Sequence, residues 1–65
     1  MAAGFNLARV RAEYREMPDL RLTCSQASRL WQVEYSTCES VLDELVRDGF
    51  LYKTDDGAYV ATPNT

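Results

Sequence analysis

Cys24 and Cys38 have the most reactive side chains of this sequence, because a thiol can bind a metal, attack a substrate or form a disulfide. The chain has no histidine, and its two cysteines are not in a CxxC motif. A zinc site would therefore lack ligands, and one pair of cysteines does not make a disulfide framework. Each cysteine lies near the start of a predicted helix, and Cys38 falls on the apolar face of its helix. Because free cysteines tend to be buried, we expect reduced structural thiols. A disulfide between the two helices is the alternative, and it requires Cα atoms within about 7 Å of each other.

The other polar residues do not form a catalytic pattern. The sequence has no Gly-rich phosphate loop, and no nucleophile lies at motif spacing from a base. Asp43, Glu44 and Asp48 follow one another along a predicted helix, unlike the aspartate-rich loop of a calcium site. We therefore expect no enzymatic activity, no metal and no small-molecule cofactor.

Acidic residues are concentrated in the second half of the chain. Positions 34–56 hold seven acids and two bases, a net charge of −5, whereas positions 1–33 hold five arginines and three acids, a net charge of +2. The whole chain has a net charge of −3. Phosphate contacts supply much of the affinity for nucleic acid, so this charge distribution disfavours DNA as a partner. The seven acids are Glu34, Glu39, Asp43, Glu44, Asp48, Asp55 and Asp56.

Helix-start and turn patterns predict the elements that position these residues. Thr23 precedes Gln26 by three residues, which is the spacing of a capping box at a helix N-terminus. Ser36 and Glu39 repeat that spacing, and Gly49 is suited to the left-handed residue that ends the second of these helices. An Asp-Gly pair near the end of the chain predicts a hairpin turn.

These signals predict an α+β fold in a single domain over residues 1–65, with three helices, a short strand and a C-terminal hairpin. The first helix has an apolar stripe from Ala3 to Met17 and ends before Pro18, and Asn6 offers a cap for a slightly later start. Leu30 and Trp31 are the expected buried anchors of the second helix. The predicted ranges are about 5–16, 24–31 and 37–48 for the helices, about 20–22 for the strand and about 50–61 for the hairpin.

Length and composition limit the class of protein. The chain has 65 residues, of which 46% are hydrophobic, and this suits one small globular domain. No apolar run approaches the roughly 20 residues of a membrane span. The first residues lack the long apolar segment of a secretory signal. We therefore expect a cytoplasmic protein without a membrane partner.

Residues 20–61 resemble the winged helix-turn-helix domains of bacterial transcription regulators. The resemblance rests on the segments LRLT, TCSQASRLW, STCESVLDELVRDGFL and YKTDDGAYV. It implies that residues 37–48 are a recognition helix, that the hairpin is a wing, and that the protein binds double-stranded DNA in transcription regulation. This chain has Gln32 where the family often has glycine, so the turn there must be longer or of another type. On the matching positions, the implied DNA contacts are Ser36, Thr37, Ser40, Arg47 and Lys53.

The acidic charge supports a second hypothesis, in which the domain is a protein-interaction module that does not bind DNA. Glu39, Asp43 and Glu44 would then meet a basic partner. Leu7 and Tyr14 on the first helix would support a homodimer. A domain of 65 residues is marginally stable alone, so burial of part of this helix in a dimer is physically reasonable.

Overall fold

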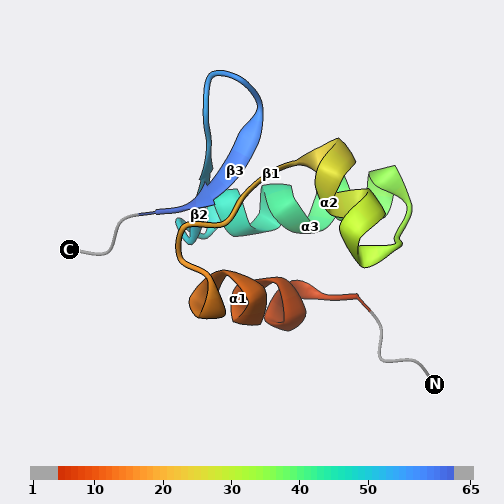
Figure 1. Ribbon diagram of the computed structural model, residues 1–65, viewed down its shortest axis with the longest axis horizontal. Helices are drawn as coiled ribbons and strands as arrows, with labels where there is room; N and C mark the ends of the chain where they lie inside the picture. The colour runs from red at the N-terminus through yellow and green to blue at the C-terminus, as the bar shows by residue number, and fades with distance from the viewer. Residues whose placement is uncertain (1–4, 63–65) are drawn as a thin grey trace.

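Three helices and a three-stranded antiparallel sheet make up the domain, in a computed structural model that describes residues 5–62 (Figure 1). The predicted α+β class is confirmed. The strand order is β1-β3-β2, and α3 lies between α1 and the hairpin of β2 and β3 (Figure 1). The elements are α1 (Leu7–Glu16), β1 (Arg21–Thr23), α2 (Cys24–Trp31), α3 (Tyr35–Arg47), β2 (Leu51–Lys53) and β3 (Ala58–Ala61).

Helix α1 begins two residues later than the apolar spacing predicts. The side chain of Asn6 caps it by accepting a hydrogen bond from the backbone N–H of Arg9 at 3.0 Å. Asn6 itself is extended, so the helix cannot include Phe5. Met17 is 49% exposed, and its assignment to the buried stripe is wrong because the helix has already ended. Ala3 lies outside the described residues.

Helix α2 follows β1 directly and has the predicted bounds. Its capping box is confirmed: the Thr23 hydroxyl accepts from the Gln26 N–H, and the Gln26 side chain accepts from the Thr23 N–H, both at 3.1 Å. The strand is shifted by one residue from the prediction, because Thr23 still pairs with Ala58 of β3. Trp31 is buried as expected. Leu30 is 55% exposed, so its predicted role as a buried anchor is wrong.

Helix α3 starts earlier than its sequence pattern predicts. Its N-cap is Glu34, which makes no side-chain capping bond, and the N–H of Cys38 already donates to the Glu34 carbonyl at 2.9 Å. Ser36 is therefore inside the helix, and the predicted capping box with Glu39 is wrong. In the preceding turn, Gln32 adopts a left-handed conformation with φ 54° and ψ 51°.

Two glycines with positive φ complete the fold around β2 and β3. Gly49, with φ 83°, ends α3 as predicted, because its N–H donates to Val46 and the next N–H, of Phe50, donates back to Leu45, both at 3.0 Å. Gly57, with φ 87°, closes the hairpin turn, and its N–H donates to the Thr54 carbonyl at 2.9 Å.

The core lies where α1 and α2 pack against α3 and the sheet. Tyr14 is 1% exposed, and its hydroxyl donates to the backbone carbonyl of Tyr59 at 2.8 Å, which ties α1 to the central strand. The other buried side chains come from all three helices and both hairpin strands: Val10, Cys24, Ala27, Trp31, Cys38, Leu42, Leu45, Leu51, Ala58 and Tyr59.

The longest helix, α3, has 13 residues. Within residues 5–62, no helix has the length and apolar character needed to cross a membrane.

Candidate nucleic-acid interface

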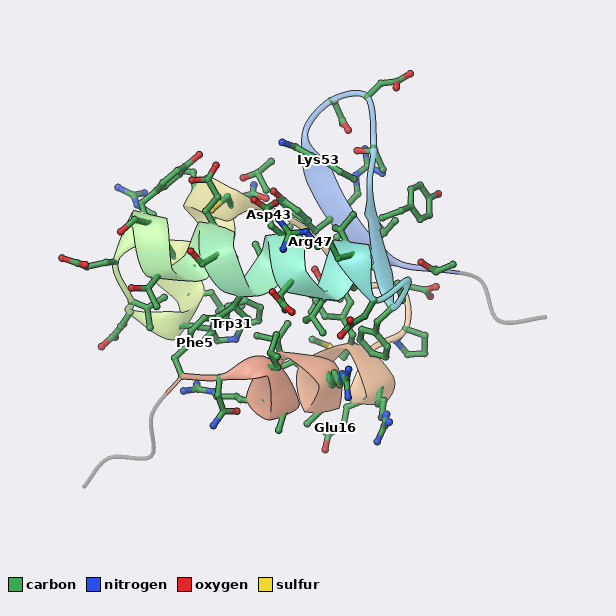
Figure 2. The ribbon with its side chains drawn as sticks, turned by 180° about the vertical axis from the view of Figure 1, so that it is seen from behind. Phe5, Glu16, Trp31, Asp43, Arg47 and Lys53 are labelled. Carbon is green, nitrogen blue, oxygen red and sulfur yellow. The ribbon has the colours of Figure 1, made fainter. Side chains whose placement is uncertain are left out.

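One exposed stripe of α3 carries most of the residues that the sequence indicates as DNA contacts. Ser36, Ser40, Asp43 and Arg47 recur at helical spacing, and all four are exposed, as is Thr37 beside them. The opposite side of α3 is buried in the core, which fixes the direction of this stripe. Asp43 and Arg47 lie on the side of α3 away from α1 (Figure 2). We call Ser36, Ser40, Asp43 and Arg47 the α3 stripe.

The hairpin brings Lys53 to the same side of the molecule (Figure 2). Lys53 is an exposed residue of β2, and its Nζ lies 5.5 Å from the centre of the Tyr59 ring. Stacking on the ring holds the ammonium group near α3. The structure therefore places Lys53 of β2 and Arg47 of α3 on the same side of the molecule, although three residues separate these two elements.

Tyr59 connects the hairpin to the α3 stripe. Its side chain is 1% exposed, and its hydroxyl donates to Asp43 Oδ1 at 3.3 Å. The pKa of Tyr59 is raised to about 12, mainly by burial and to a smaller extent by the negative charge of Asp43. The phenol therefore stays protonated at neutral pH and remains a hydrogen-bond donor to Asp43.

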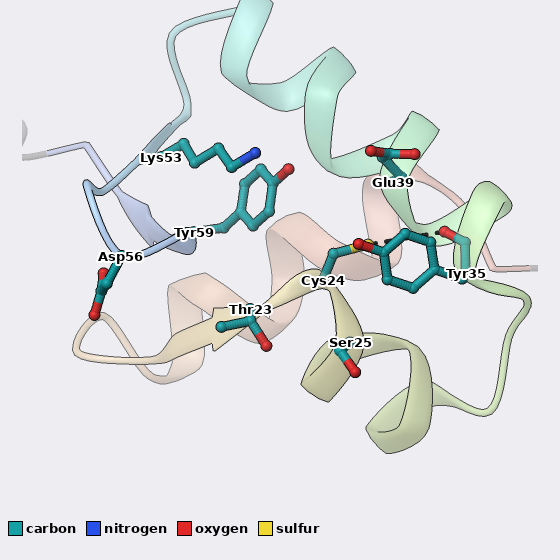
Figure 3. A pocket seen from close by; sticks show the side chains of 9 residues that line it. Thr23, Cys24, Ser25, Tyr35, Glu39, Lys53, Asp56 and Tyr59 are labelled. Carbon is teal, nitrogen blue, oxygen red and sulfur yellow. Dashed lines mark hydrogen bonds between the residues drawn. The ribbon is translucent and has the colours of Figure 1, made fainter.

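A groove of about 230 Å³ lies where the start of α2, the start of α3 and the hairpin meet (Figure 3). Tyr35 and Tyr59 contribute aromatic side chains to it, and Glu39 and Lys53 contribute opposite charges. This mixture of charges gives the groove no strong preference for one kind of ion. Its other lining residues are Thr23, Cys24, Ser25, Asp56 and Gly57.

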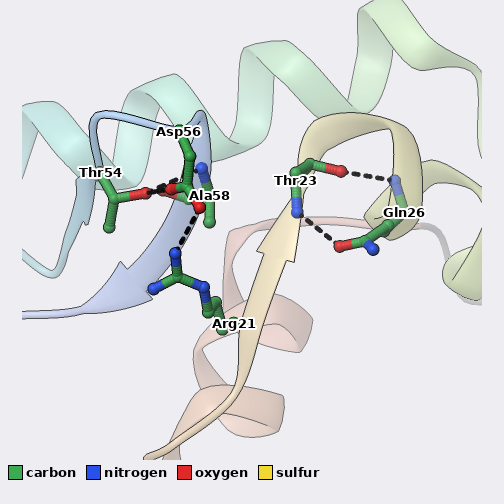
Figure 4. A network of polar contacts seen from close by, with 6 residues as sticks. All are labelled: Arg21, Thr23, Gln26, Thr54, Asp56 and Ala58. Carbon is green, nitrogen blue, oxygen red and sulfur yellow. Dashed lines mark hydrogen bonds and ion pairs between the residues drawn. The ribbon is translucent and has the colours of Figure 1, made fainter.

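Arginines from the first half of the chain pair with two acids of the second half. Arg21 of β1 reaches Asp56 in the hairpin turn at 2.5 Å, and Arg11 of α1 reaches Asp48 at 3.2 Å (Figure 4 shows the first pair). Hydrogen bonds from the Thr54 hydroxyl and from Arg21 lower the pKa of Asp56. The hairpin turn is therefore less negative toward a partner than its sequence suggests.

A third acid, Glu44, lies 3.9 Å from Arg47 within α3. Arg47 is largely exposed, and an exposed pair at this distance is weak, so its guanidinium group can turn to another partner. Within residues 5–62, Glu39 and Asp43 form no ion pair with arginine or lysine. The acidic charge that remains on α3 is concentrated at these two residues.

The residues expected for a homodimer differ in accessibility. Leu7 is partly buried and packs against the core, whereas Tyr14 is fully buried with its hydroxyl bonded to Tyr59. Tyr14 is thus inaccessible to a second copy in the folded monomer. This burial argues against the expected role of Tyr14 in a homodimer. Glu39, Asp43 and Glu44 are exposed and accessible to a partner.

Both cysteines are buried free thiols. The pKa of Cys38 is raised to about 12, mainly by burial and to a smaller extent by the neighbouring Cys24. Burial also raises the pKa of Cys24. The Cys24 thiol donates to the Tyr35 carbonyl at 3.8 Å. Such protonated thiols are poor nucleophiles and poor metal ligands. No group of three potential metal ligands occurs in the part of the chain that the structure describes.

Sequence reasoning missed Tyr59 as part of this surface and missed the two arginine–aspartate pairs. The alternation in AYVA points Tyr59 to one side of the sheet, but its contact with Asp43 depends on how α3 packs. Comparisons of the chain with protein-family models, curated proteins and solved structures found no match.

Proposed function

We propose that this chain is a winged helix domain that binds double-stranded DNA, with α3 as the recognition helix and the β2–β3 hairpin as the wing. The order of elements and the strand order β1-β3-β2 agree with the winged helix-turn-helix proteins that residues 20–61 resemble. The α3 stripe, exposed beside Lys53, is the observation that carries the proposal. An α-helix fits the major groove of B-DNA, so Ser36, Thr37 and Ser40 would reach phosphates or base edges there.

Pairing within the molecule weakens the main objection to DNA binding. Arg21 and Arg11 lie beside Asp56 on the hairpin and Asp48 at the end of α3, and they partly offset the negative charge of these two acids. Arg47 and Lys53 would contact phosphates on either side of the helix. Because few cations face the DNA, the domain would bind mixed-sequence DNA weakly, with a dissociation constant of about 10⁻⁴–10⁻⁶ M near physiological salt. A transcription regulator of this kind would gain affinity from specific bases or from a second bound copy.

Arg47→Ala and Lys53→Ala test the proposal by fluorescence anisotropy of a labelled mixed-sequence duplex, titrated at several salt concentrations. Each substitution should weaken binding and reduce the slope of log affinity against log salt by about 0.9, the value for one lost phosphate contact. Arg15→Ala is the matched control, because Arg15 is an exposed arginine on α1. Its affinity and slope should equal those of the wild type.

Two results would overturn the proposal. One is the absence of binding at about 100 μM protein even in low salt, where non-specific DNA binders are saturated. The other is an equal loss for Arg15→Ala and Arg47→Ala, because this would indicate a general charge effect instead of a defined surface.

The second candidate function is docking to a basic protein partner, and one observation favours it. Glu39 and Asp43 are exposed acids without ion pairs within residues 5–62, and the neighbouring Tyr35 is 54% exposed. An exposed aromatic beside carboxylates suits lysine or arginine side chains. Calorimetric titration with a lysine- and arginine-rich peptide tests this function. Binding that Glu39→Gln weakens, in a protein that does not bind DNA, would place this candidate first, and sedimentation would test self-association.

A further inference from the structure

Asp43 occupies an unusual place in the α3 stripe. It is the one acid among the four stripe residues, and Tyr59 supplies a hydrogen bond to one of its two oxygens, Oδ1. The Tyr59 ring is buried, so the hydroxyl that reaches Asp43 comes from a fixed part of the core. A solvated surface carboxylate needs no such support. The arrangement favours one orientation of the Asp43 carboxylate on the face that the proposed function assigns to DNA.

A carboxylate in the major groove is tolerated only where it accepts a hydrogen bond. Near the phosphates it is repelled, and without a partner it also loses its hydration. Cytosine presents an amino group, N4–H₂, as a donor in the major groove, whereas guanine presents acceptors that would repel Asp43. Adenine presents a donor next to an acceptor, which suits an amide better than a carboxylate. The negative charge of Asp43 would thus weaken binding to most DNA sequences and favour those that present cytosine at this position.

We propose that Asp43 determines sequence specificity by accepting a hydrogen bond from a cytosine amino group in the major groove, with Tyr59 as the residue that positions its carboxylate. This inference rests on the proposed DNA-binding function and names the base that one stripe residue reads. Tyr59 does not touch the DNA in this arrangement. It acts through Asp43, and Lys53, which stacks on the Tyr59 ring, is the phosphate contact beside it.

Selection of bound duplexes from a pool with randomised sequence, followed by anisotropy on the selected duplex, tests this inference. The wild type should require cytosine at one position and lose about tenfold in affinity when that base is replaced. Asp43→Asn should change the preferred base at this position to adenine, because an asparagine amide pairs with the donor and acceptor of adenine. The asparagine side chain can still accept from Tyr59, so the variant should fold like the wild type.

Tyr59→Phe tests the positioning of the Asp43 carboxylate, and Glu39→Gln tests the effect of the negative charge of α3. Tyr59→Phe keeps the buried ring and removes only the hydroxyl, so it should reduce the preference for cytosine by about threefold while affinity for mixed-sequence DNA stays unchanged. Glu39→Gln removes one negative charge from α3 and keeps both partners of the Tyr59–Asp43 hydrogen bond. It should raise affinity for all duplexes equally and leave the preferred base unchanged.

The outcomes distinguish this inference from the function on which it rests. If the wild type binds no duplex, both fail. If it binds mixed-sequence DNA with a clear salt dependence, but Asp43→Asn selects the same bases as the wild type, the role of Asp43 is refuted and DNA binding stands. A change of preferred base by Glu39→Gln at the same position would also refute it.

Discussion

The hydroxyl of Tyr14 makes a buried hydrogen bond that we expect to be measurable in the stability of the domain. It donates to the Tyr59 carbonyl at 2.8 Å, and both side chains are 1% exposed. Tyr14→Phe removes this donor with little change of shape. The free energy of unfolding should fall by about 1 kcal/mol, the usual net value of one such bond. Urea denaturation followed by circular dichroism measures this change.

Tyr52→Phe is the control for that measurement, because Tyr52 is 46% exposed. Its free energy of unfolding should differ from the wild type by less than about 0.5 kcal/mol, as for most surface substitutions. The dependence on urea concentration should have the same slope in all three proteins. Equal stability of Tyr14→Phe and the wild type would show that the hydroxyl bond contributes nothing net.

At the scale of elements, the turn between α2 and α3 contains a strained residue. Gln32 adopts φ 54°, a conformation that glycine reaches without a steric penalty. Gln32→Gly should therefore raise the free energy of unfolding by about 0.5 kcal/mol, after the greater flexibility of glycine in the unfolded chain is included. Thermal and urea denaturation of the two proteins test this.

Gly49→Ala does the reverse at the turn that ends α3, because it replaces a left-handed glycine by a residue with a Cβ atom. Gly49 has φ 83°, and no atom lies within 4 Å of the position that an added Cβ would take. Any loss of stability would then come from the backbone conformation alone, and we expect about 1 kcal/mol. If Gln32→Gly destabilises and Gly49→Ala does not, left-handed strain does not decide the stability of these turns.

The sequence predicts which helices and strands form, but it is less accurate for the residues at which the helices begin. One capping pattern, at Thr23, forms as expected, whereas the identical spacing at Ser36 does not, because α3 begins at Tyr35 and Ser36 is already inside the helix. Leu30 is exposed because α2 buries Cys24, Ala27 and Trp31 on a stripe that Leu30 does not share. Hydrophobicity alone does not reveal which apolar residue lies off the stripe.

The candidate site was predictable only in part. The exposed face of α3 follows from its helical period, since the apolar residues of that helix define the opposite side. Contacts between distant residues do not follow from any local pattern. Arg21 and Asp56 are 35 positions apart and meet because β1 pairs with β3, whereas Asp43 and Tyr59 are 16 apart and meet because the sheet packs against α3. Asp56 and Asp43 therefore have hydrogen-bond partners within the protein, whereas the sequence shows them only as negative charges that disfavour DNA.

At the scale of the whole molecule, buried thiols and phenols link stability to alkaline pH. Burial raises the pKa of Cys38 from 9.0 to about 12, and the pKa of Tyr14 from 10.0 to about 12. Above pH 9 the thiol of the unfolded chain loses its proton while the buried thiol keeps it. The folded state then binds more protons, so rising pH favours unfolding. Stability from these groups is complete at neutral pH and is lost as pH rises toward 12.

Cys38→Ala tests this pH dependence in reducing buffer. Between pH 9 and 10, where the buried tyrosines contribute alike to both proteins, the free energy of unfolding of the wild type should fall by up to about 1 kcal/mol per pH unit for each buried thiol. A domain of this length has only about 3–10 kcal/mol in total, so the change should be large enough to measure. Cys38→Ala should be less stable at pH 7. Its stability should fall less steeply as pH rises, because Cys24 is then the one buried thiol that titrates. Equal slopes in the two proteins would show that the Cys38 thiol titrates alike in the folded and unfolded states, and that the core does not control its protonation.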